Sequence, residues 1–203
     1  MSKINIVVLI SGRGSNLQAI IDAVESGQIN GNISCVISNV PSAFGLERAK
    51  KHSIPGVVVD NKKFPDKSSY EAVLLKTIDT FAPDLICLAG YMRIVGEGII
   101  KKYKDRIINI HPALLPSFPG LHAQRQAIEA GVKESGCTVH FVDEGCDTGP
   151  IILQKKVPVI PGDTEATLSA RILEEEHKLY PKAIQLFADG KLKINGRKVE
   201  VKE

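Results

Sequence analysis

The chain has 203 residues, of which 43% are hydrophobic and 24% are charged, a composition that excludes disordered and fibrous proteins and fits one globular domain. Its net charge of +3 is spread along the chain, whereas a nucleic-acid-binding protein usually gathers its Lys and Arg on one surface. We therefore expect no nucleic-acid partner, although a small anionic ligand is compatible with this charge.

Apolar runs alternate with amphipathic helical patterns along the whole chain. The runs that predict strands are 4–10, 33–38, 56–60, 84–90, 106–111, 137–142 and 150–159. The helical patterns lie at about 16–26, 43–52, 68–81, 122–131 and 164–188. Short apolar strands separated by helices are typical of parallel sheets. We predict an α/β fold: a mainly parallel twisted sheet of about seven strands flanked by helices.

Local signals mark the ends of several predicted helices. Ser68 and Glu71 form a capping-box pattern, and Asp163 or Thr164 is placed to cap the last helix. Glycines that predict C-terminal stops are Gly27, Gly131 and Gly190. The last residues, KINGRKVEV, predict a hairpin that turns at 195–196.

The cysteines and the first residues bear on the cellular compartment. The four cysteines form no CxxC pair, and three of them sit in or beside apolar runs, which predicts free thiols and a reducing cytoplasm; they are Cys35, Cys87, Cys137 and Cys146. The opening MSKINIVVLI has too short an apolar run for a signal peptide or a membrane span. We expect a cytoplasmic protein that does not use a membrane.

The first candidate site is SGRGSN at 11–16, between the first strand and the first helix. Glycines permit a tight turn there, and the free N–H groups of a helix start can bind a phosphate. A dinucleotide fits poorly, because Leu17 stands where a third glycine would fall and the second strand ends in Ser38 and Asn39 without an acidic residue. We expect a single phosphate, with a purely structural glycine turn as the alternative.

The second candidate site is IINIHPALLPSFPG at 107–120. Asn109 and His111 are two residues apart, so they project from one face of a strand near its carboxyl end, where open α/β sheets bind ligands. An amide that can hold an oxyanion beside an imidazole that can move a proton suits acyl transfer. The alternative is a buried histidine with a satisfied structural role. Prolines stiffen the loop that follows the strand.

The third candidate site is DEGCDTGP at 143–150, an acidic loop between two predicted strands. A solvated turn is one interpretation of it. The loop also follows the carboxyl end of a strand, which would allow Asp147 to reach His111, raise its pKa or order a water molecule. The five histidines lack metal-site spacing and no GxSxG is present, so we expect neither a metal nor a serine nucleophile.

Five segments together resemble the phosphoribosylglycinamide formyltransferases, folate-dependent enzymes of purine synthesis with a Rossmann-like formyltransferase fold. They are SGRGSNLQAII near the start, LAGYMRI at 88–94, INIHPALLPSFPGLHA at 108–123, TVHFVDEGCDTGPII at 138–152 and EEEHKLYP at 174–181. The resemblance covers nearly the whole chain. It implies transfer of a formyl group from 10-formyltetrahydrofolate, a co-substrate, to the amine of glycinamide ribonucleotide, without a metal.

The resemblance also implies a role for particular positions. The catalytic residues would be Asn109, His111 and Asp147. Substrate would be bound by Gly14, Ser15 and Asn16 at its phosphate and by Glu176 at its ribose. Folate would contact Lys67, Met92, Arg93, Ile94, Val95, Asn109, Asp143, Glu144, Gly145, Cys146 and Asp147. Lys67 stands where this family commonly has Arg, and Lys lacks the bidentate fork of a guanidinium.

The implied organisation is a single formyltransferase domain over 1–203. Its phosphate- and ribonucleotide-binding half is expected at about 1–100, its catalytic and folate-binding half at about 101–190, and a hairpin at 191–203. We expect a monomer or a homodimer with small-molecule partners. The alternative function is a formyltetrahydrofolate hydrolase, which usually carries an extra amino-terminal domain, and a methionyl-tRNA formyltransferase would carry an extra carboxyl-terminal one. A non-catalytic sugar-phosphate binding module would leave the Asn, His and Asp unexplained.

Overall fold

The computed structural model describes residues 2–202, which form two compact units. The first unit ends at Ile108 and the second begins at Asn109, so the boundary falls within strand β5 (Ile107–His111). Within the described residues there are nine strands. The prediction of an α/β fold with a mainly parallel sheet is confirmed, and the strand count exceeds the predicted seven because the C-terminal hairpin contributes two further strands.

The first unit is built on four parallel strands with helices between them. Its strands lie in the order β3-β2-β1-β4, which places β1 between β2 and β4. The strands are β1 (Ile4–Ile10), β2 (Gly31–Ser38), β3 (Gly56–Val58) and β4 (Leu85–Leu88). The helices are α1 (Ser15–Glu25), α2 (Phe44–Lys51), η1 (Asn61–Lys63), α3 (Lys67–Thr80) and α4 (Glu97–Lys102).

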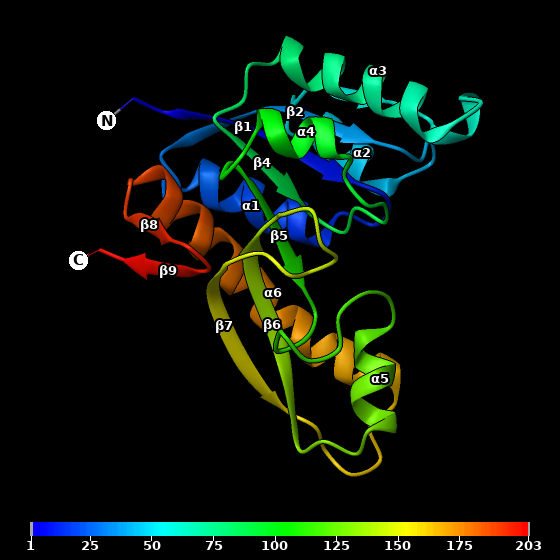
Figure 1. Ribbon diagram of the computed structural model, residues 1–203, viewed down its shortest axis with the longest axis vertical. Coiled ribbons are helices and arrows are strands. Elements are labelled where there is room, and N and C mark those ends of the chain that lie inside the picture. The colour runs from blue at the N-terminus through cyan, green and yellow to red at the C-terminus, as the bar shows by residue number, and fades with distance from the viewer. Residues whose placement is uncertain (1, 203) are drawn as a thin grey trace. The chain divides into compact units, whose positions relative to one another are not determined.

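Burial explains why these strands are apolar along almost their whole length. The last five residues of β1 and all four residues of β4 are buried, as expected for parallel strands covered on both faces. Helices α1 and α2 contact each other and β2, whereas α3 and α4 contact each other. Figure 1 shows α3 and α4 on one side of β1 and α1 on the other. Because β1 runs parallel to both β2 and β4, the carboxyl ends of these three strands lie at one edge of this unit, where polar loops follow.

The second unit has strands that run in both directions and are covered by one long helix. Its strands lie in the order β5-β6-β7-β9-β8, with β6 antiparallel to β7 and β8 antiparallel to β9. Besides the end of β5, the elements are α5 (Ala123–Glu129), β6 (Glu134–Phe141), β7 (Ile151–Pro158), α6 (Glu165–Ala188), β8 (Leu192–Asn195) and β9 (Lys198–Val201). Helix α6 packs on β6 and β7 and contacts α5 (Figure 1). The predicted hairpin is confirmed as β8 and β9.

Most predicted helix ends agree with the structure, but one cap is wrong. Thr164 caps α6 in a reciprocal capping box with Thr167. Helix α3 begins at Lys67 and its cap is Asp66, whose carboxylate accepts from the Ser69 N–H at 2.8 Å, so the predicted Ser68 and Glu71 box does not form. Asp66 lies two residues before Ser68 and starts the helix first, and Asp is among the best N-cap residues.

Other local predictions can also be compared with the structure. The three predicted stop glycines have positive φ after helical ends, which confirms them: Gly27 (77°), Gly131 (63°) and Gly190 (64°). Helix α4 was not predicted, because EGIIKK is too short to show a helical period. All four thiols are free, three of them buried. Among residues 2–202, no helix has the length and apolar character needed to cross a membrane.

Candidate active site

The predicted phosphate loop joins β1 to α1 in the first unit. Gly14 precedes α1 with φ of 68°, a left-handed conformation that favours glycine. A Cβ added to Gly14 would lie 2.7 Å from the Gly45 Cα, so the loop also needs glycine for close packing against α2. Ser15 and Asn16 open the helix, and Asn16 is buried. The helix start therefore presents its N–H groups where the sequence predicts a phosphate.

Arg48 on α2 forms hydrogen bonds with this loop and with α1. Its Nε donates to the Arg13 carbonyl at 2.9 Å, and its Nη1 donates to Gln18 Oε1 at 3.1 Å. The Arg48 guanidinium also lies 5.1 Å from the centre of the Phe44 ring. The hydrogen bond from Arg48 to the Arg13 carbonyl thus helps to fix the backbone of the loop. Sequence patterns did not indicate Arg48.

The segment predicted to contact folate, 92–95, also lies in the first unit. Met92 and Ile94 are 65% and 67% exposed, and two neighbouring exposed apolar side chains suit a surface that meets a ligand. Arg93 stacks 5.1 Å from the Tyr70 ring centre, whereas Val95 is buried. The segment therefore offers two apolar side chains and one guanidinium.

Lys67, the predicted contact of the folate tail, is bound within its own helix. Its Nζ lies 3.4 Å from Glu71 Oε1, one turn further along α3. The Lys67 side chain is 59% exposed, so this pair is screened by water and weak. A carboxylate ligand would compete with Glu71 for the ammonium.

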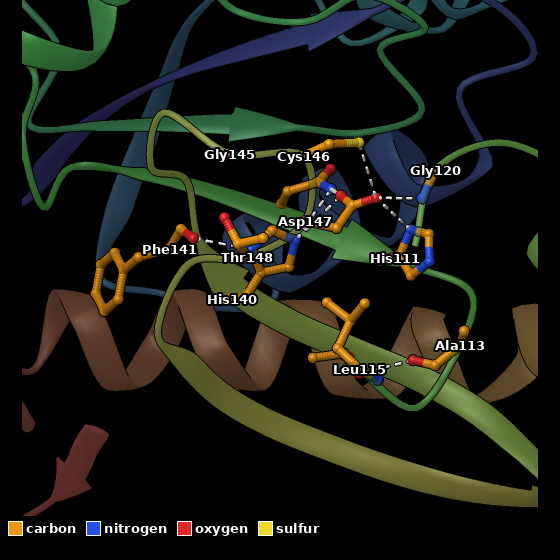
Figure 2. Close-up of polar contacts among 12 residues, drawn as sticks. His111, Ala113, Leu115, Gly120, His140, Phe141, Gly145, Cys146, Asp147 and Thr148 are labelled. Carbon is orange, nitrogen blue, oxygen red and sulfur yellow. Dashed lines mark hydrogen bonds and ion pairs between the residues drawn. The ribbon is translucent and has the colours of Figure 1, made fainter. Parts of the chain in front are cut away.

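The second unit brings Asn109, His111 and Asp147 together. His111 Nδ1 lies 3.3 Å from Asp147 Oδ2, and Asn109 Nδ2 donates to Asp147 Oδ1 at 3.3 Å. Figure 2 shows contacts from the Asp147 carboxylate to both the His111 ring and the Gly120 backbone. The contact between Asp147 and His111, which the sequence only allowed, is present. A carboxylate, an imidazole and an amide thus share one small polar cluster.

His111 is 4% exposed, and both of its ring nitrogens have partners. Its Nε2 lies 2.8 Å from the Phe118 carbonyl, which can only accept, so Nε2 carries the proton in the neutral ring. Nδ1 is then the nitrogen free to take up a second proton, and it faces Asp147. Burial lowers the pKa of His111 below the ordinary 6.5, although Asp147 and the Phe118 carbonyl act in the opposite direction. The expectation that Asp147 would raise the pKa of His111 is correct for that contact alone, and the burial outweighs it.

Asp147 is held as an anion at a constrained position. Its Oδ2 accepts from the Gly120 N–H at 2.8 Å. Burial by itself would raise the pKa of Asp147, but the contacts with His140, Gly120 and His111 lower it to about 2. Its backbone has φ of 55°, a left-handed conformation that is uncommon outside glycine. Strained residues of this kind cluster at functional sites.

The Asn109 amide is oriented by a residue that the sequence reasoning missed. His140, 2% exposed on β6, lies with its Nδ1 2.8 Å from the Phe141 carbonyl, which can only accept, so Nδ1 carries a proton. Nε2 lies 3.3 Å from Asn109 Nδ2 and 3.5 Å from Asp147 Oδ1, so it accepts from the amide when the ring is neutral and pairs with the carboxylate when the ring is charged. The two N–H bonds of the amide therefore point to His140 and Asp147. Both contacts are long, so an oxyanion could replace one at small cost.

The loop from Asp143 to Thr148 is closed by its own side chains. Asp143 Oδ1 accepts from Thr148 Oγ1 at 2.6 Å and from the Gly145 N–H at 3.2 Å. Arg197 donates to Asp143 Oδ2 at 3.3 Å and to the Thr148 carbonyl. The Asp143 carboxylate, predicted to contact folate, thus stabilises the loop that carries Asp147. Glu144 and Cys146 are both exposed, and the Cys146 Sγ lies 3.7 Å from Asp147 Oδ2.

Glu176, the predicted ribose contact, is a buried carboxylate on α6. Burial, together with the nearby charge of Glu176, raises the pKa of the Cys137 thiol to about 12. The structure therefore places Glu176 beside β6, in the same unit as the Asn109, His111 and Asp147 cluster. Within residues 2–202, no group of three or more His, Cys, Asp or Glu side chains is arranged to hold a metal ion.

A family model described as "Formyl transferase" matches residues 4–184. The chain therefore belongs to the formyltransferase family, whose reactions use a folate-type one-carbon donor. Its close relatives include the phosphoribosylglycinamide formyltransferase of Escherichia coli, which is 50% identical over 191 residues covering 94% of this chain and 90% of that protein. The chain is thus a transferase of the class to which that enzyme belongs.

Further comparisons place the chain within this family. It is 52% identical to part of a trifunctional purine biosynthetic protein of Drosophila pseudoobscura, covering 93% of this chain and 14% of that protein. A glycinamide ribonucleotide transformylase from Symbiobacterium toebii superposes with a TM-score of 0.97 at 51% identity over 99% of this chain and 95% of that one. A formyltetrahydrofolate deformylase from Pseudomonas syringae has a TM-score of 0.93 but 28% identity, covering all of this chain and 67% of that one. The hydrolase alternative is therefore the more distant relation.

Proposed function

We propose that this chain transfers the formyl group of 10-formyltetrahydrofolate to the amine of glycinamide ribonucleotide, releasing formylglycinamide ribonucleotide and tetrahydrofolate. The observation that carries the proposal is the cluster of Asn109, His111 and Asp147 in a chain 50% identical to an enzyme of that name. An amide, an imidazole and a carboxylate are the groups that a formyl transfer requires. The folate acts as a co-substrate, and no step needs a metal.

Binding is divided between the two parts of the chain. Residues of about 1–100 bind the ribonucleotide phosphate at the glycine loop, through Gly14, Ser15 and Asn16. Residues of about 101–190 carry the catalytic cluster, with Glu176 accepting from the ribose hydroxyls. Folate contacts are assigned to Lys67, Met92, Arg93, Ile94 and Val95 and to the loop from Asp143 to Asp147.

The chemistry begins when the substrate amine attacks the formyl carbon and converts its carbonyl oxygen to an oxyanion. Asn109 Nδ2 donates to this oxygen in place of one of its two long contacts, which were 3.3 Å each. A preorganised donor of this kind stabilises charge that develops only in the transition state. Asn109 is therefore assigned the oxyanion.

A proton must move from the attacking nitrogen to the departing folate nitrogen. Asp147 accepts it and passes it to His111 Nδ1, 3.3 Å away, whose low pKa leaves the ring neutral and ready to take it. The imidazolium formed is stabilised by the Asp147 carboxylate. On collapse of the tetrahedral intermediate, the C–N bond to folate breaks and the proton returns through Asp147 to the folate nitrogen.

The direction of the His111 shift predicts the pH dependence of turnover. Above its pKa the ring is neutral and can accept the proton, whereas below its pKa the ring is already charged and cannot. We expect kcat at saturating substrates to be constant above about pH 7 and to fall on acidification with a midpoint below 6.5. Asp147, with a pKa near 2, adds no step between pH 5 and 8. A kcat that rises as the pH falls would show that His111 must start the reaction charged.

The proposed setting is the cytoplasm, because four free thiols suit a reducing compartment. Small molecules are the proposed partners, without nucleic acid or a membrane, and the active form is a monomer or a homodimer. Sedimentation analysis at two protein concentrations would decide between these two forms.

The proposal is tested by mixing purified protein with 10-formyltetrahydrofolate and following donor consumption by absorbance. We expect rapid consumption only when glycinamide ribonucleotide is also present, in amounts equal to the product formed. Consumption at the same rate without the ribonucleotide would identify a hydrolase instead. Absence of consumption under both conditions would reject the whole proposal.

A further inference from the structure

The Ser11 hydroxyl lies between the phosphate loop and the segment 91–95. Ser11 directly follows β1, and its Oγ accepts from the Met92 N–H at 2.8 Å. Its own N–H donates to the Gly90 carbonyl at 3.1 Å. Two hydrogen bonds therefore join the first residue of the glycine loop to the start of the segment assigned to folate.

The same hydroxyl is anchored on its other side by β2. Ser11 Oγ donates to Asn39 Oδ1 at 2.5 Å, and the side chain of the buried Asn39 lies beside that of Asn61. This bridge is possible because β1 pairs with both β2 and β4, so the loops after all three strands start side by side. The hydroxyl uses its one proton on Asn39 and a lone pair on Met92.

The segment 91–95 depends on such anchors because it is neither helix nor strand. Met92 and Ile94 project outward, and their apolar side chains add little to hold the backbone in place. Apart from the Ser11 contacts, the segment is fixed by a hydrogen bond between the Tyr91 and Tyr70 hydroxyls at 2.5 Å and by Arg93 on the Tyr70 ring. The Ser11 hydroxyl is the contact that ties the segment to the phosphate loop.

We propose that Ser11 is a positioning residue that keeps the segment 91–95, which contains the folate residues 92–95, in register with the phosphate loop, so that each ligand favours binding of the other. This inference rests on the proposed function. Neither ligand needs to touch the hydroxyl, because Ser11 acts through the Met92 backbone on one side and the glycine loop on the other. Coupling between two ligands through a shared element is reciprocal, so it can be measured from either side.

The test is Ser11→Ala, which removes the hydroxyl and leaves the Met92 N–H and Asn39 Oδ1 without this partner. We expect KM to rise about tenfold for both substrates, as for the loss of two part-exposed hydrogen bonds, while kcat changes by less than about threefold. The more specific readout is calorimetric. In the wild-type protein, tetrahydrofolate should lower the Kd for glycinamide ribonucleotide about fivefold, and in Ser11→Ala this ratio should approach one.

The matched control is Ser34→Ala in the same unit, whose hydroxyl donates to the Ile6 carbonyl at 3.2 Å within the sheet. It should leave both KM values and the coupling ratio unchanged. If Ser11→Ala unfolds, Ser11→Cys keeps the shape with only a weak donor and should show the same loss of coupling. A coupling ratio equal in variant and wild type, or no coupling in the wild type, would overturn the positioning role. Failure of the proposed function would be visible separately, as a wild-type protein that transfers no formyl group.

Discussion

Asp147→Asn is expected to lower kcat by about 10³- to 10⁴-fold, the upper part of the range for a positioned proton-transfer group. The amide has nearly the same shape but no negative charge, so it can neither relay the proton nor stabilise the His111 imidazolium. Its single oxygen can accept from the Gly120 N–H or from the Asn109 amide but not from both, as the two carboxylate oxygens now do. The measurement is kcat at saturating concentrations of both substrates.

Folding of this variant needs its own control, because Asp147 contributes to stability. A carboxyl whose pKa is lowered to about 2 stabilises the folded state above its unfolded pKa and loses this contribution as the pH falls toward 2. Asp147→Asn should therefore unfold at a somewhat lower temperature at pH 7 while keeping its circular dichroism spectrum. Asp189→Asn, at the C-cap of α6, removes an equal charge and should leave kcat unchanged. A kcat within threefold of wild type in Asp147→Asn would remove Asp147 from the mechanism.

Asn109→Ala is expected to lower kcat by about 10²- to 10³-fold, the usual effect of deleting one oxyanion donor. KM should change much less, because the amide is assigned to charge that exists only in the transition state. Loss of the amide also leaves His140 Nε2 without its Asn109 donor, so the variant should be slightly less stable. Steady-state kinetics with each substrate varied in turn separates the two effects.

The control for this variant is Asn32→Ala, an exposed position on β2 that should keep wild-type kinetics. A rise in KM at constant kcat in Asn109→Ala would mean that the amide binds substrate and transition state equally. The oxyanion would then have to be held by another group. Asn109 and Asp147 lie 38 residues apart in the chain, but their side chains are hydrogen-bonded. The double variant should therefore be measured beside the two single variants. Because the two side chains touch, their effects should not be additive.

Much of the fold could be predicted because its signals are local. The apolar run at 4–10 predicted β1 with its observed bounds, and the tail hairpin turned where Asn195 and Gly196 indicated. Helix α4 was missed because six residues are shorter than two helical turns. The cap of α3 was wrong because Asp66 and Ser68 are both good caps, and only the folded backbone selects between them.

Fewer properties of the candidate site than of the fold could be predicted from the sequence. The alternation of Asn109 and His111 in an apolar strand was a local signal, and Thr138 and His140 show the same alternation in β6, so His140 could have been found in the same way. The protonation state of His111 could not be predicted from the sequence. Its pKa results from opposing effects of burial and of Asp147, and burial depends on the packing of the whole unit. The contacts of Ser11 could not be predicted either, because they depend on the order of β2, β1 and β4 in the sheet.

The fate of the formyl carbon tests the central claim most directly. The protein would be supplied with 10-formyltetrahydrofolate carrying ¹³C in the formyl group, together with glycinamide ribonucleotide, and the products followed by NMR. Transfer through the Asn109, His111 and Asp147 cluster predicts that the label appears in an amide of the ribonucleotide, in an amount equal to the tetrahydrofolate released. Label recovered as free formate, with the ribonucleotide unchanged, would contradict the account.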